Sequence, residues 1–119
     1  MCVDYSKLNK VTKTQNCNIP NLTDSVYSAT KIKYFSKLYL IKGFYQVPIS
    51  ENGRKYTAFS TLNQFKRLSF GSKNSGIQFQ KNMQEILADF KNKKVIVYID
   101  DISIMSETFD EHLILVEKV

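Results

Sequence analysis

The sequence predicts an α+β fold in which helices pack on one face of an antiparallel sheet. An apolar, β-branched run, a short acidic turn and a second apolar run occupy residues 94–105, a pattern typical of a β-hairpin. Apolar side chains also recur at helical spacing over residues 75–90 and again after residue 108. An isolated two-stranded hairpin is only marginally stable in water, so the hairpin is expected to pack against these helices.

Shorter elements are expected before residue 75, where turn-forming residues separate short apolar runs. In chain order they are a strand at 2–5, a loop over 6–20, a short helix opened by Pro20, a strand at 34–40, a strand starting at 45–49, a turn at 51–53, and a hairpin formed by 57–60 and 65–68.

Two amphipathic helices are predicted in the last third of the chain. The first covers about residues 75–90, and Asn74 or Ser75 can cap its first turn. Its expected apolar face consists of Phe79, Met83, Ile86, Leu87 and Phe90. The second begins near Thr108, because Thr108 and Glu111 fit a capping box in which each side chain satisfies a free amide. His112 has acidic neighbours and is expected at the surface.

Composition indicates one globular, intracellular domain. The 119 residues are 43% hydrophobic and 24% charged, which allows a modest core and argues against a disordered chain. The N-terminus lacks the basic and then apolar pattern of a signal peptide, and no apolar run approaches the roughly 20 residues of a transmembrane span. Cys2 and Cys17 have no metal-binding spacing and are expected to be reduced thiols.

The charge is divided unevenly along the chain. Residues 1–84 contain thirteen Lys or Arg and three acids, a net charge of +10, whereas residues 85–119 contain four Lys and eight acids, a net charge of −4. The basic part would attract phosphate backbones. The alternative is an ordinary lysine-rich surface.

The acidic turn of the predicted hairpin, Asp100 and Asp101, is the strongest candidate site. Two adjacent carboxylates repel each other, and a cation between them would remove that penalty. Mg²⁺ takes oxygen ligands and is usually held by one or two carboxylates together with substrate phosphates. The pattern therefore indicates metal-assisted phosphoryl or nucleotidyl transfer. The alternative is a solvated turn without a ligand.

Four blocks of sequence, in this order, resemble those of a known family. The blocks are Met1-Cys2-Val3-Asp4-Tyr5-Ser6-Lys7-Leu8-Asn9-Lys10; Tyr34 to Leu40 followed by Gly43-Phe44-Tyr45-Gln46-Val47; Phe70-Gly71 with Asn74 and Phe79-Gln80; and Tyr98-Ile99-Asp100-Asp101 through Leu113. Together they resemble the reverse transcriptase domain of gypsy-like long-terminal-repeat retrotransposons, which reads MCVDYRKLNK, YFSKLDL…GYHQI, MPFGLTNAPATFQ and YLDDILIFS…EHL in the same places.

The resemblance implies an antiparallel palm sheet with packed helices and part of a fingers subdomain. Residues 1–33 and 50–75 would be fingers-like, and residues 34–49 and 76–119 palm-like. It also implies a domain truncated at both ends, which lacks the family's upstream strands, thumb and RNase H domain. Tyr39 would lie beside the Asp100–Asp101 turn on a neighbouring antiparallel strand.

The family's chemistry implies a role for each matching residue. The family's partners are an RNA or DNA template-primer and deoxynucleoside triphosphates, and its cofactor is Mg²⁺. Asp100 and Asp101 would be the catalytic carboxylates and metal ligands. Phe44, Phe70 and Gly71 would bind the nucleotide, although Phe44 can equally be a core residue. The residues that would face the nucleic acid are Lys66, Arg67 and Lys73, for which the alternative is a surface without a specific role.

Three departures from the family pattern bear on activity. The family has a catalytic Asp where this chain has Tyr39, and prolines where it has Ser69 and Gly76. A phenol is neutral at pH 7 and a poor Mg²⁺ ligand, so the sequence predicts a reverse transcriptase domain without polymerase activity. A non-catalytic nucleic-acid-binding module remains an alternative. A diguanylate cyclase, which also has an acidic hairpin, is disfavoured because the chain has no Gly-Gly-(Asp/Glu)-Glu-Phe signature.

Overall fold

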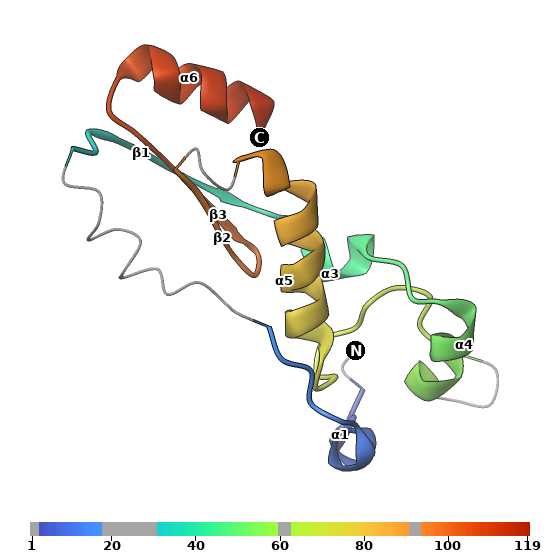
Figure 1. Ribbon diagram of the computed structural model, residues 1–119. Helices are drawn as coiled ribbons and strands as arrows, with labels where there is room; N and C mark the ends of the chain where they lie inside the picture. Colours follow the sequence, from blue (N-terminus) through green and yellow to red (C-terminus); the bar gives the residue numbers. More distant parts are fainter. Residues whose placement is uncertain (1–2, 18–30, 60–62, 91–93) are drawn as a thin grey trace. The chain divides into compact units, whose positions relative to one another are not determined.

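The computed structural model describes residues 3–17, 31–59, 63–90 and 94–119 (Figure 1). The chain divides into two compact units. The loop unit comprises Met1–Asn16 and Ile41–Phe79, and the sheet unit comprises Cys17–Leu40 and Gln80–Val119. None of the helices in the described ranges is long and apolar enough to cross a membrane.

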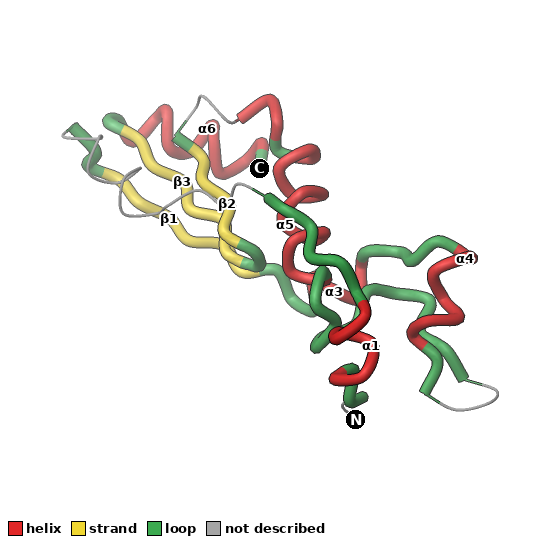
Figure 2. The backbone as a smooth tube through the Cα atoms, turned by 60° about the horizontal axis from the view of Figure 1, so that its bottom comes forward, coloured by secondary structure: helices red, strands yellow, loops and turns green. Residues whose placement is uncertain are grey.

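In its described residues the sheet unit contains three antiparallel strands, coloured yellow on the backbone tube of Figure 2. These are β1 (Tyr34–Tyr39), β2 (Val95–Tyr98) and β3 (Asp101–Ser106), with β3 in the centre. Tyr39 is opposite Asp101 on one side, and Tyr98 is opposite Asp101 on the other. The predicted α+β fold, its hairpin and the placement of Tyr39 beside the acidic turn are therefore confirmed.

Helix α6 (Phe109–Lys118) lies along β1 and β3 (Figures 1 and 2). His112 joins the helix to both strands, because its Nε2 is 2.8 Å from Ser36 Oγ and its Nδ1 is 2.8 Å from Ser106 Oγ. Alternate residues of a strand face the same side, so Ile102 and Ile104 share the covered face with Ser106. All three are at most 4% exposed.

The buried position of His112 corrects the expectation that it lies at the surface. Its side chain is only 7% exposed, although its neighbours Asp110 and Glu111 are exposed. Burial is tolerated because both ring nitrogens have hydroxyl partners. The predicted capping box is half formed: Thr108 Oγ1 accepts from Glu111 N, but the Glu111 carboxylate accepts from Glu107 N, one residue before the cap.

The helix predicted over 75–90 is confirmed as α5 (Ser75–Ile86), followed by the 3-10 helix η2 (Ala88–Phe90). Phe79, Met83 and Leu87 are buried, as the apolar spacing predicted. Ile86 is not, since 70% of its surface is exposed. The helix therefore has a narrower buried stripe than the sequence suggested.

The loop unit contains short helices where strands or loops were expected. They are α1 (Ser6–Val11), α3 (Gly43–Gln46), α4 (Glu51–Arg54) and the 3-10 helix η1 (Lys55–Thr57). The expected strands at 2–5 and 45–49 and the loop assigned to residues 6–11 were therefore wrong, as far as the described residues go. In the described residues, the expected hairpin of 57–60 and 65–68 is reduced to a single bridge between Ala58 and Gln64, and Arg67 forms a bridge with Pro48 instead. The helix expected at Pro20 lies outside the described residues.

Tertiary hydrogen bonds explain why residues 6–11 are helical despite their polar sequence. Asn9 donates from Nδ2 to Gly71 O at 2.8 Å and accepts at Oδ1 from Lys73 N at 2.8 Å. Asn74 donates to Lys13 O just after the helix, also at 2.8 Å. Because these partners are about 60 residues away in the chain, local sequence patterns could not reveal them.

Candidate functional site

The acidic turn is a two-residue hairpin loop with an unusual backbone. Tyr98 and Asp101 are paired, which leaves Ile99 and Asp100 at the tip. Ile99 has a φ of 52°, in the left-handed region that a β-branched residue rarely adopts. Tight hairpins of one common type need positive φ at this position and usually place Gly there. With Ile the conformation costs on the order of 1–3 kcal/mol, so the surrounding structure must hold it.

Gln80 of α5 holds the turn. Its amide nitrogen donates to Val97 O at 2.8 Å, and its amide oxygen accepts from Ile99 N at 2.6 Å. The side chain is completely buried. The sequence analysis assigns no role to Gln80. Its spacing from Met83 and Leu87 places a polar side chain on the apolar face of the helix, and a polar residue there indicates a buried hydrogen bond.

Asp100 has a carboxylate oxygen that is poorly satisfied. Within the part of the chain that the structure describes, its Oδ1 is buried and has no hydrogen-bond partner. Two effects raise the pKa of Asp100 above its usual value: burial is the larger, and the negative charge of Asp101 is the smaller. A buried, unpartnered carboxylate oxygen is a site at which a cation would be stabilising.

Asp101 already has a cation beside it. Lys37 Nζ lies 2.9 Å from Asp101 Oδ2, and the two side chains are 39% and 28% exposed, respectively. The pKa of Lys37 is raised mainly by its hydrogen bond to Asp101 and, to a smaller extent, by one to Tyr39. The ammonium also lies 4.9 Å from the centroid of the Tyr39 ring.

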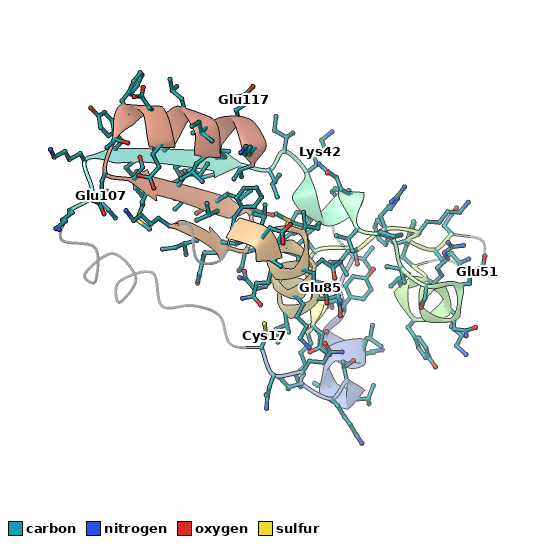
Figure 3. The ribbon with its side chains drawn as sticks, turned by 45° about the horizontal axis from the view of Figure 1, so that its top comes forward. Cys17, Lys42, Glu51, Glu85, Glu107 and Glu117 are labelled. Carbon is teal, nitrogen blue, oxygen red and sulfur yellow. The ribbon has the colours of Figure 1, made fainter. Side chains whose placement is uncertain are left out.

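Polymerases commonly use a pair of metal ions, and the donor set here does not fit such a pair. Tyr39, opposite Asp101, presents a 65% exposed phenol where a third carboxylate would be needed. No three His, Cys, Asp or Glu side chains among the described residues come together in a way that could hold a metal ion. Glu107, labelled in Figure 3, lies just after the other end of β3. It pairs with Lys94 at 2.6 Å. Among the described residues, the buried carboxylate oxygen without a hydrogen-bond partner is Asp100 Oδ1.

The predicted nucleotide-binding residues belong to the loop unit, where they form an aromatic cluster. Phe44 is 7% exposed and stacks on Phe79 with centroids 4.8 Å apart and planes at 10°. Phe70 packs on Phe44 at 4.6 Å and remains 49% exposed. Gly71 has a φ of 88°, which a side chain would strain. In this cluster Phe44 is a core residue, whereas Phe70 and Tyr45, which meets Phe70 edge to face at 5.4 Å, are exposed rings.

The three predicted nucleic-acid contacts, also in the loop unit, differ in their surroundings. Arg67 donates from Nη1 to Gln46 O at 3.0 Å, and Lys73 donates from Nζ to Thr12 O at 3.1 Å. Lys66 is exposed. Arg67 and Lys73 therefore direct a donor to the protein backbone, which distinguishes their surroundings from those of Lys66.

Comparison with known proteins identifies the family of this chain. The whole chain, residues 1–119, matches the family model described as reverse transcriptase (RNA-dependent DNA polymerase). The Pol polyprotein from transposon opus of Drosophila melanogaster is 42% identical over 115 residues, which are 94% of this chain and 12% of the relative. The polyprotein from transposon gypsy of the same organism is 30% identical over 122 residues, or 100% of this chain and 12% of the relative.

Solved structures with the same fold include foamy viral enzymes. The protease-reverse transcriptase in complex with an RNA/DNA hybrid matches with a TM-score of 0.80 and 29% identity over 97% of this chain and 16% of its own. The form called dRH, in complex with double-stranded DNA, matches with a TM-score of 0.78 and 30% identity over 99% of this chain and 21% of its own. The chain thus spans a small part of each relative. It belongs to the reverse transcriptase family.

Proposed function

We propose that this chain carries the carboxylate hairpin of an RNA-directed DNA polymerase but does not itself extend a primer. In this proposal Asp100 and Asp101 are the family's catalytic carboxylates, and Mg²⁺ is the ion that Asp100 would hold. When bound, such an ion stabilises charge on the phosphates that react. The observation that carries the proposal is the pairing of Tyr39 with Asp101, which puts a neutral phenol where a carboxylate ligand is required.

The proposed nucleic-acid partner is an RNA or DNA template with its primer. The foamy viral relatives bind an RNA/DNA hybrid and double-stranded DNA, and residues 1–84 of this chain carry a net charge of +10. Phe70, with Gly71 beside it, is the proposed contact for a deoxynucleoside triphosphate, and buried Phe44 supports it from behind. Lys66, Arg67 and Lys73 are the proposed contacts to the nucleic-acid backbone.

We also propose the family's subdomain assignment for this chain. Residues 1–33 and 50–75 would belong to fingers, and residues 34–49 and 76–119 to palm. The strands β1, β2 and β3 and helix α6 all fall in the palm part.

A second candidate function is nucleic-acid binding without catalysis. It is favoured by the same two features, a basic segment and a carboxylate site with too few ligands. Both candidates predict that the purified chain binds nucleic acid and does not extend a primer.

Primer extension tests the proposal. The purified chain is mixed with a primer-template, deoxynucleoside triphosphates and Mg²⁺ or Mn²⁺, and an Asp100→Asn variant serves as the matched control. We expect binding of the primer-template in a mobility-shift assay but no extension above the level of Asp100→Asn. Extension by the unmodified chain that disappears in Asp100→Asn would contradict the proposal, since it would show that two carboxylates suffice.

A further inference from the structure

Three side chains meet on one face of the sheet where β1 passes the acidic turn. Lys37 and Tyr39 are two residues apart on β1 and therefore point to the same side. Asp101 is directly opposite Tyr39 on β3. The ammonium of Lys37 lies 2.9 Å from Asp101 Oδ2 and 4.9 Å from the Tyr39 ring centroid. The positive charge is thus held between a carboxylate and the face of an aromatic ring.

Both contacts favour an ammonium at this position. The carboxylate attracts it directly, and the electron-rich face of the phenol ring attracts cations within about 6 Å. A carboxylate at position 39 would give Lys37 a competing partner two residues away on its own strand. With Tyr39 there, the charge of Lys37 is directed to Asp101.

Because Asp100 is next to Asp101, the ion pair between Lys37 and Asp101 differs from an isolated surface pair. Isolated surface pairs contribute little to stability. Here, however, Asp101 is 28% exposed, and it adjoins a second carboxylate whose Oδ1 is buried with no hydrogen-bond partner among the described residues. One positive charge therefore offsets the repulsion between two adjacent negative charges.

We propose that Lys37 is a built-in counter-ion for the hairpin carboxylates and takes the place of one metal ion. The chain then keeps its acidic hairpin folded without a divalent ion and holds at most one such ion, at Asp100. A second ion at Asp101 would have to displace the ammonium or lie next to it. The inference rests on the proposed function only in treating Asp100 and Asp101 as metal ligands.

Thermal unfolding with and without divalent ions tests the role of Lys37. Unfolding is followed by circular dichroism in EDTA and in Mg²⁺ for the unmodified chain, Lys37→Met and Lys37→Arg. Lys37→Met keeps the side chain's length without its charge, whereas Lys37→Arg keeps the charge. We expect Lys37→Met to have a lower Tm in EDTA and to recover it in Mg²⁺. The Tm of the unmodified chain and of Lys37→Arg should be the same in both.

Mn²⁺ binding, measured by electron paramagnetic resonance, gives a second readout. Loss of one neighbouring positive charge should tighten Mn²⁺ binding about tenfold in Lys37→Met. Combining Lys37→Met with Asp101→Asn should abolish that gain. Lys94→Met is the matched control, because Lys94 also pairs with a carboxylate, Glu107, away from the turn. The Tm of Lys94→Met should be the same with and without Mg²⁺.

Two results would overturn the inference. One is a Lys37→Met chain whose Tm in EDTA is unchanged, or is lowered but not recovered in Mg²⁺. The other is unchanged Mn²⁺ affinity in Lys37→Met. Primer extension by the unmodified chain would instead contradict the proposed function and would leave these two readouts as they are, so the failures are distinguishable.

Discussion

The amide oxygen of Gln80 accepts a 2.6 Å hydrogen bond from the backbone N–H of Ile99, the residue with left-handed backbone at the tip of the acidic hairpin. A helix side chain thereby fixes the backbone of the residue that precedes Asp100. The same amide donates to Val97 O, so the turn is held at two points of its backbone. The buried glutamine therefore stabilises the strained backbone of the turn.

Replacing Gln80 by Met should destabilise the chain strongly. Met has a similar length but can neither donate to Val97 O nor accept from Ile99 N, so one buried and one partly buried backbone group lose their partner. The expected loss is about 2–4 kcal/mol in the free energy of unfolding. Denaturant unfolding measures it, with Gln84→Met, an exposed glutamine on the same helix, as the control. Equal effects of the two substitutions would contradict the role of Gln80.

Replacing Asp100 by Asn should stabilise the chain at neutral pH and have no such effect in acid. The folded chain holds the Asp100 proton more tightly than the unfolded chain, because burial and the charge of Asp101 raise its pKa. The ionised carboxylate therefore costs stability as the pH rises above its usual pKa, and the cost disappears below about pH 4. Thermal unfolding across this pH range measures it. Asp89→Asn, at an exposed position, serves as the control. A stability difference for Asp100→Asn that is the same at every pH would show that the raised pKa of Asp100 is not its cause.

Replacing Tyr39 by Asp should increase the affinity of the hairpin for Mn²⁺ and Mg²⁺. The new carboxylate would lie opposite Asp101, as a further oxygen ligand from a second strand. A unit charge about 4 Å from a divalent ion contributes roughly 2 kcal/mol even at the dielectric constant of water, so the gain should exceed tenfold. Calorimetric titration measures it. Tyr39→Phe should leave the affinity unchanged, and an equal gain in Tyr39→Phe would show that removal of the hydroxyl, not the added charge, is responsible.

Removing the charge of Lys66 should weaken nucleic-acid binding equally for all sequences. Binding by the basic segment should fall steeply as salt increases, because phosphate contacts release counter-ions. Lys66→Ala should lower the slope of log affinity against log salt by about 0.7–0.9, the value for one phosphate contact. Fluorescence anisotropy with labelled strands measures the slope. Lys118→Ala, at the end of α6 in the acidic part of the chain, should leave it unchanged.

Arg67→Ala should differ from Lys66→Ala in one respect. The Arg67 side chain donates from Nη1 to Gln46 O, so its removal should also lower the stability of the loop unit. If Lys66→Ala reduces stability as much as Arg67→Ala, the hydrogen bond from Arg67 to Gln46 O does not stabilise the loop unit.

Local sequence patterns were sufficient to predict the sheet and the two longer helices. Strand β2 consists of β-branched and aromatic residues, and β3 places isoleucines at 102 and 104, side chains that a helix accommodates less well. The spacing of Phe79, Met83 and Leu87 matches one side of a helix. The hairpin, the capping role of Thr108 and the position of Tyr39 beside Asp101 followed from these patterns and from the family resemblance.

The short helices, the burial of His112 and the partners of the acidic turn were decided only by the tertiary structure. Helix α1 depends on Asn9, which is bonded to residues 62 and 64 positions away. His112 is buried because Ser36, 76 positions away, and Ser106 each meet one of its ring nitrogens. Lys37 meets Asp101, and Gln80 meets Ile99, across different elements. A hydrogen bond or ion pair between distant residues leaves no periodic signal in the sequence, because it depends on how the elements pack. Apolar burial, in contrast, recurs with the period of the helix or strand and can be read from the chain alone.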